Sequence, residues 1–264
     1  MNKKRYPSDL TDAEWMVIAP LIPPAKPGGR PRTVNMREVL NGIFYVLRTG
    51  CPWRYMPHDL PNWMTCYMYY RRFCREGVWE RINAILRQEI REKEGRHPDP
   101  SEVIIDSQSA KTTEQGGPRG YDAGKKVRGR KRHMVVDTLG LMVLVWVHAA
   151  HIQDRTGARE VLQRLGAWGA RLRVIWADGG YAGELQEWAR KVYGWRIEIV
   201  KKIAGKGQGF CVLPHRWVVE RTFAWINRNR RLAKDYERLP LMSEGFVYAA
   251  MVRLMMRRLT CTNT

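Results

Sequence analysis

Apolar side chains recur at helical spacing through the first part of the chain. Three stretches have them three or four positions apart, which predicts amphipathic helices: residues 35–47, 62–74 and 79–92. A shorter helix is expected to begin near Thr11, because Glu14 follows it at the spacing of a capping box. Gly50 has the position of a helix C-cap. This part of the chain therefore predicts an all-helical unit.

The pattern changes to that of β-strands after residue 100. Val103, Ile104 and Ile105 are consecutive β-branched residues, as in a strand buried on both faces. Two alternating stretches, 132–137 and 141–148, predict a hairpin. Strands and helices then alternate. The expected strands are residues 172–177 and 196–200, and the expected helices are 154–165, 183–192 and 215–231, followed by a packing helix with a basic face over 246–259.

The charged stretch 91–100, which ends in Pro98-Asp99-Pro100, is the predicted domain boundary. We expect a helical, helix-turn-helix-like domain over residues 1–97 and an α/β domain over residues 98–264. A mixed sheet flanked by helices follows from the order of the expected elements. The same order is found in the ribonuclease H-like fold.

Three carboxylates are the candidate catalytic residues. Asp106 and Asp178 each follow a predicted buried strand, and Glu220 lies in a strongly basic helix. Together they would form an oxygen-rich site suited to Mg²⁺, for which Mn²⁺ could substitute. Two such ions about 3.5–4 Å apart can activate an attacking oxygen and stabilise the leaving oxygen at a phosphate.

Each of these acids also has a structural interpretation. The two aspartates could be turn residues, and Glu220 could pair with Arg216 or Arg221 on its helix. Other acids are weaker candidates, since they are expected in a loop, a hairpin turn and a helix cap: Asp122, Asp137 and Asp154.

A formal net charge of +20 predicts a polyanionic partner, and double-stranded DNA is the one expected. A glycine-rich basic loop is expected over residues 112–132, where it would meet DNA beside the first aspartate. The predicted DNA contacts are Lys125, Lys126, Arg128, Arg130, Lys131, Arg132, His133, Arg216, Arg71 and Arg72. Trp225 is a candidate for base stacking, although a helical tryptophan is more often part of the core, as are the tyrosines beside Arg71.

The remaining composition narrows the protein class. The five cysteines contain no Cys-x-x-Cys pair, which argues against a zinc site or a disulfide framework. The chain has no apolar run of the roughly 20 residues that span a bilayer. We therefore expect no membrane partner and a cytoplasmic, nucleoid-associated protein.

Several of these stretches together resemble a known family. They are Ile105-Asp106-Ser107, Gly124-Lys125-Lys126, residues 129–133, Ala177-Asp178-Gly179-Gly180-Tyr181 and Arg216-Trp217-Val218-Val219-Glu220-Arg221. In this combination the chain resembles the DDE transposases of bacterial insertion sequences, in the IS5 family of the wider IS4-like group. Cys51-Pro52-Trp53-Arg54 and Gly77-Val78-Trp79-Glu80 resemble that family's N-terminal region.

The resemblance implies a ribonuclease H-like catalytic domain, Mg²⁺ dependence, binding to terminal inverted repeats, and strand transfer by a homodimer or higher multimer on paired DNA ends. Two positions depart from the wider group's signature, because Leu213 stands for its tyrosine and Asn227 for its lysine. Residues 178–220 also leave no room for the large β insertion of hairpin-forming relatives. A structure-specific nuclease of the same fold and an inactive DNA-binding protein are the alternatives.

Overall fold

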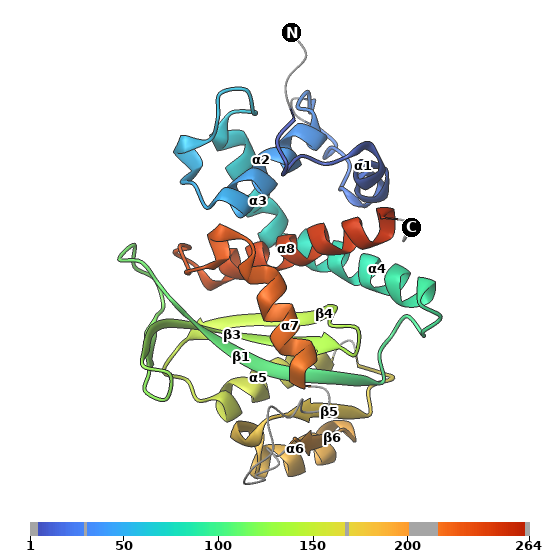
Figure 1. Cartoon of the computed structure of the whole chain (residues 1–264), viewed down its shortest axis with the longest axis vertical. Coiled ribbons are helices and arrows are strands. Elements are labelled where there is room, and N and C mark those ends of the chain that lie inside the picture. Colours follow the sequence, from blue (N-terminus) through green and yellow to red (C-terminus); the bar gives the residue numbers. More distant parts are fainter. Residues whose placement is uncertain (1–4, 29–30, 167–168, 201–215, 262–264) are drawn as a thin grey trace, which may run out of the picture.

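The protein consists of a helical layer stacked on a mixed α/β layer (Figure 1). The computed structural model describes residues 5–28, 31–166, 169–200 and 216–261. The N-terminal helices are α1 (Asp12–Ile18), α2 (Met36–Thr49), α3 (Trp63–Arg75) and α4 (Val78–Lys93). The capping box of Thr11 and Glu14 is confirmed, and Gly50 ends α2 with φ of 74°.

The sheet contains both parallel and antiparallel pairs. Its strands are β1 (Glu102–Lys111), β2 (Gly120–Asp122), β3 (Val127–Asp137), β4 (Met142–Ala149), β5 (Val174–Ala177) and β6 (Arg196–Ile199). The order across the sheet is β2-β3-β1-β5-β6, and β4 pairs with β3. β1 is antiparallel to β3 and parallel to β5. The other helices are α5 (Asp154–Gly166), α6 (Glu184–Tyr193), α7 (Arg216–Asn227) and α8 (Pro240–Thr260).

The predicted basic loop over 112–132 is wrong in its second half. β3 already begins at Val127 and pairs with β1 as far as Lys111, which lies opposite Gly129. The short strand β2 precedes it and was not predicted. The charged residues of β3 hid the strand, because the alternation rule looks for apolar side chains on the buried face.

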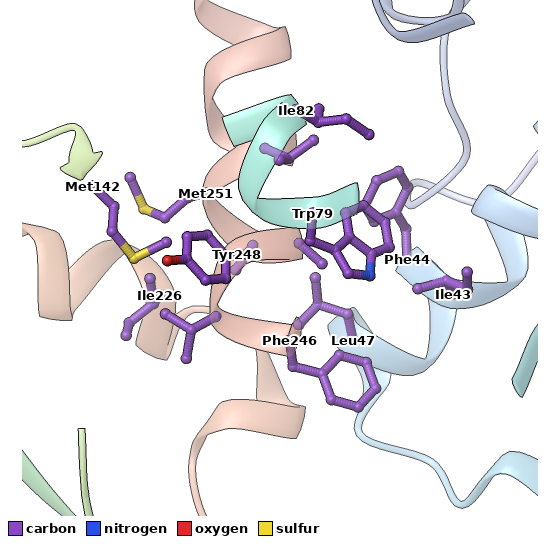
Figure 2. Close-up of a cluster of buried hydrophobic side chains, with 14 of the residues drawn as sticks. Ile43, Phe44, Leu47, Trp79, Ile82, Met142, Ile226, Phe246, Tyr248 and Met251 are labelled. Carbon is purple, nitrogen blue, oxygen red and sulfur yellow. The ribbon is translucent and has the colours of Figure 1, made fainter. Parts of the chain in front are cut away.

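The long helix α8 lies at the centre of the core. Phe246, Tyr248 and Met251 of α8 pack among side chains of α2, α4, α7 and β4 (Figure 2). The hydrophobic core is therefore continuous from the N-terminal helices to the sheet. The prediction of a packing helix with a basic face is confirmed, but the helix begins earlier, at Pro240. Among the described residues, no helix is both long and apolar enough to cross a membrane.

Candidate active site

The structure places Asp106 and Asp178 on neighbouring strands. Asp106 lies inside β1, not at its end as predicted, because β1 continues along β3. Its parallel pairing with β5 stops earlier, at Ile104 opposite Trp176. Each aspartate comes two residues after that last pair. The register therefore sets the two carboxylates beside each other where β5 ends.

Both aspartates belong to the face of the sheet that α7 covers. Ile104 packs in the core that includes Val218 and Val219 of α7, whereas Val103 and Ile105 pack in a second core with α5 and α6. Successive side chains of a strand point to opposite faces, so Asp106 shares the face of Ile104. α7 packs directly on β1. Glu220 is an exposed residue of this helix.

Backbone amides orient both aspartates. The amide of Ser107 donates to Oδ1 of Asp106 at 2.6 Å, and the amide of Gly180 donates to Oδ1 of Asp178 at 2.8 Å. Asp178 thereby caps the short helix Gly179–Tyr181, as its interpretation as a turn residue predicts.

The donor chemistry of the three acids suits a hard divalent cation, since all are carboxylates. The positions of these side chains do not form a full set of metal ligands. Within the described part of the chain, no group of three or more His, Cys, Asp or Glu side chains lies close enough together to hold a metal ion. The strand register sets the two aspartates beside each other. Glu220 lies on α7, the helix that packs on β1.

A polar network lies under β1, on the face opposite α7. The Ser107 hydroxyl donates to Oδ1 of Asp154 at 2.8 Å, and Nζ of Lys131 lies 3.0 Å from the same oxygen. Burial acts to raise the pKa of Asp154, but the hydrogen bonds from Lys131 and Ser107 outweigh it and lower the pKa. Nζ of Lys125 donates to the backbone carbonyl of Ser107 at 2.9 Å. These contacts fix the strand segment that carries Asp106.

Two histidines extend this network as neutral side chains. Nδ1 of His133 lies 2.7 Å from Nε2 of His148. Burial lowers the pKa of His133 to about 3, and the nearby His148 adds to the shift. Burial also lowers the pKa of His148 to about 4. Tyr181 lies edge-on to His133 and is fully buried, so its pKa is raised well above its usual value.

The predicted DNA contacts of the chain segment 125–133 divide into two groups. Lys125, Lys126 and Arg128 are exposed. The others are buried: Arg130, Lys131, Arg132 and His133. For these four the predicted role as surface contacts does not agree with the structure, because strand β3 directs their side chains into the protein.

Arg130 and Arg132 instead hold the chain that follows α7. Arg130 donates to the carbonyls of Glu237 and Arg238 and forms an ion pair with Asp235 at 3.2 Å, with both side chains fully buried. Arg132 donates to the carbonyl of Leu232 at 2.8 Å. These bonds tie β3 to the segment between α7 and α8 and so help to position α7.

The other predicted DNA contacts lie apart from one another. Arg71 and Arg72 are half-buried on α3, where Arg72 pairs with Glu76 at 3.2 Å. Arg216 begins α7, but its side chain is outside the described residues, as is Leu213. The ring of Trp225 is contacted by the guanidinium groups of Arg221 and Arg258, so it is neither a free stacking surface nor a purely apolar core residue.

Sequence reasoning missed a group of cations that gathers around Trp225. They come from α2, α4, α8 and from α7 with the residue after it: Arg48, Lys93, Arg221, Arg228, Arg257 and Arg258. The sequence signals were the strongly basic helix expected over 215–231 and the basic face expected on residues 246–259. The remaining members are distant in the chain, so no local pattern could have grouped them.

The class of protein follows from comparison with known families. Residues 97–255, more than half of the chain, match the family described as "Transposase DDE domain". A DDE transposase domain implies the ribonuclease H-like fold, and the mixed sheet with flanking helices agrees with it. Residues 10–83 match the family described as "Putative transposase of IS4/5 family". The chain belongs to the DDE transposases of the IS4/5 family.

Two of three similar proteins come from an insertion element, and the third is uncharacterized. A Burkholderia cepacia protein, "Insertion element IS402 uncharacterized 16.2 kDa protein", is 33% identical over 115 residues, which are 40% of this chain and 76% of the relative. "Putative transposase for insertion sequence element IS402", from the same species, is 33% identical over 129 residues, 46% of this chain and 59% of the relative. "Uncharacterized protein y4sN" of Sinorhizobium fredii is 29% identical over 80 residues, 30% of this chain and 64% of the relative.

Proposed function

We propose that this transposase binds the terminal inverted repeats of an insertion sequence, cleaves DNA at their ends and joins the freed 3′-hydroxyl to target DNA. The parallel register that sets Asp106 beside Asp178 is the observation that supports it most directly. The family match supports a DNA substrate and the reaction class.

Asp106 and Asp178 would hold the divalent cation between them, with Glu220 completing the ligand set from α7. When bound, Mg²⁺ or Mn²⁺ supplies Lewis-acid activation of the attacking oxygen and neutralises charge on the phosphate. The chain's own contribution is orientation. The amides of Ser107 and Gly180 fix the aspartates, and the network under β1 holds the strand in place.

DNA recognition is assigned to the N-terminal helices, with α3 as the helix that enters a groove. In a helix-turn-helix the second helix enters the groove, and α3, which follows α2 in the chain, would take that place. α4 packs its apolar face, including Trp79 and Ile82, into the core. α3 has an outward stripe with exposed Met64 and Met68. Arg71 and Arg75 continue this stripe at helical spacing.

The exposed Lys125, Lys126 and Arg128 would contact the backbone of DNA close to Asp106. Paired ends would be held by a homodimer or a higher multimer, with a second copy of the chain on the other end. Two carboxylates alone repel DNA, and these cations offset that repulsion.

A strand-transfer assay tests the proposal. The substrate is DNA carrying the inverted repeats that flank the gene, with Mg²⁺ and a target plasmid. Wild-type protein should join cleaved ends to the target. Asp106→Asn, Asp178→Asn and Glu220→Gln should each bind DNA but lose roughly 10²–10³-fold or more in joining rate, the size of effect seen when one charged or polar group is removed from an active site.

Glu187→Gln is the matched control, because Glu187 is an exposed acid on α6 and should retain wild-type joining. Cleavage without joining would favour a structure-specific nuclease. DNA binding without cleavage under Mg²⁺ or Mn²⁺ would show an inactive DNA-binding protein. Normal joining by Glu220→Gln alone would remove that residue from the site and leave the aspartates in place.

A further inference from the structure

A large open cavity lies between the helical layer and the sheet. It has a volume of about 960 Å³ and is lined by α2, α4, α7, α8 and the turn between β3 and β4. We call it the basic groove and define it by six cations: Arg48, Lys93, Arg221, Arg228, Arg257 and Arg258. Glu94 is the one acid among the groove's lining residues within the described chain.

Several cations of the groove already have partners within the protein. Nε of Arg257 lies 3.6 Å from Oε1 of Glu14. Arg48 is used to hold the backbone carbonyl of Arg228 at the end of α7. Nε of Arg221 is buried without a hydrogen-bond partner.

The positive charges also lie close enough to act on one another. Burial lowers the pKa of Arg258, and the neighbouring Arg221 lowers it further. Burial likewise lowers the pKa of Arg253, at the groove wall, to about 10, and the charges of Arg257 and Arg48 add to this. Such self-repulsion costs free energy that a bound polyanion would offset.

Tryptophans form part of the same surface. The guanidinium of Arg221 lies 4.4 Å from the ring centre of Trp217 and 4.6 Å from that of Trp225. Arg258 lies 4.4 Å from the ring of Trp225. These contacts hold both guanidinium groups at the groove wall, where they are arranged before any ligand binds.

The groove shares helix α7 with one candidate acid. Trp217 and Arg221 line it and lie within one helical turn of Glu220 along α7. Its lining continues along α7 to Arg228, just after the helix, and reaches the helical layer at Arg48. The groove therefore extends from the helix that carries Glu220 to the N-terminal helices.

We propose that the basic groove binds the sugar-phosphate backbone of DNA along α7, between the acids and the N-terminal helices. This inference rests on the proposed function, since it extends the DNA substrate of the same site. The binding is expected to be independent of sequence, because the groove offers charged donors and phosphate contacts carry no sequence information.

The test measures DNA affinity against salt, with a chelator present so that no cleavage occurs. The probes are a labelled duplex of arbitrary sequence and one of its single strands. The variant is Lys93→Glu with Arg228→Glu. The control is Arg190→Glu with Lys191→Glu on α6, which changes the net charge equally and also lies at a helix end.

The groove variant should weaken binding and reduce the slope of log K against log salt for duplex by about 1.8, from about 0.9 for each of two lost phosphate contacts. The single-stranded probe shows which form of DNA the groove prefers. Equal slopes for the groove variant and the control would overturn the inference. That result is separate from the proposed function, because wild-type strand transfer is measured in a different assay.

Discussion

Two basic regions of this transposase differ in how many of their cationic side chains are buried. The basic run, residues 125–133, is dense in sequence, and four of its side chains are buried in contacts within the protein. The basic groove collects cations that are far apart in sequence and directs them to an open cavity. Local charge density in the sequence therefore does not indicate which cationic side chains reach solvent. The direction in which the backbone points each side chain decides whether it is exposed. Strand β3 points Arg130 and Arg132 into the protein.

The comparison also separates two uses of arginine. A buried guanidinium with several carbonyl acceptors, such as Arg130, joins segments that are far apart in the sequence. In the groove, the guanidinium groups of Arg221 and Arg258 rest on the ring of Trp225 at the wall of an open cavity. The first use stabilises the fold, and the second places positive charge beside the cavity.

The largest effect on stability is expected at the buried ion pair of Arg130 with Asp235. Arg130→Met should lower the free energy of unfolding by about 3–5 kcal/mol, because it leaves Asp235 and several carbonyls buried without their partner. Urea unfolding followed by circular dichroism measures it. Arg128→Met is the control on the exposed part of the same strand, with an expected change within about 0.5 kcal/mol. Similar losses of unfolding free energy in Arg130→Met and Arg128→Met would contradict the distinction between buried and exposed cations of β3.

An intermediate effect is expected on the pH dependence of stability, from the neutral pair His133 and His148. Their pKa values are about 3 for His133 and about 4 for His148, below the value of about 6.5 in the unfolded chain. The unfolded state therefore takes up more protons as the pH falls. Their contribution to stability is full above pH 6.5 and is lost as the pH falls toward 4.

The measurement is the free energy of unfolding between pH 4 and pH 6.5, the range set by these pKa values. His148→Gln should reduce its dependence on pH by about 1 kcal/mol per pH unit, since one fewer buried group titrates. His58→Gln alters an exposed histidine and serves as the control. An unchanged pH dependence in His148→Gln would show that His148 is not held neutral by the fold.

The smallest effect is expected at the exposed residues of the basic run. Lys126→Gln with Arg128→Gln should reduce the salt slope of duplex binding by up to about 1.8, with no loss of stability beyond about 0.5 kcal/mol. Lys131→Gln should leave the slope unchanged, because this side chain points inward to Asp154 and the Ile152 carbonyl. A slope change in Lys131→Gln comparable to that of the exposed pair would place DNA on the inner side of β3.

Much of the architecture was predictable because it depends on local patterns. The capping box, the glycine at the end of α2 and the hairpin of β3 and β4 each require only neighbouring residues. Strand β3 was placed incompletely, since its charged half has no apolar alternation. The candidate acids were found because each follows or occupies a recognisable element. Their shared face became visible only through the pairing of β1 with β5.

The sequence by itself determined the class of protein, the helices and strands around the acids, and the excess of positive charge. It could do so because propensity, capping and family motifs act over short distances along the chain. The tertiary structure decided which of those charges are used internally and which surround the groove. Burial and polar contacts depend on segments far apart in sequence, as the ion pair of Arg130 with Asp235 and the hydrogen bond from Arg48 to the Arg228 carbonyl show. Only folding brings such segments together.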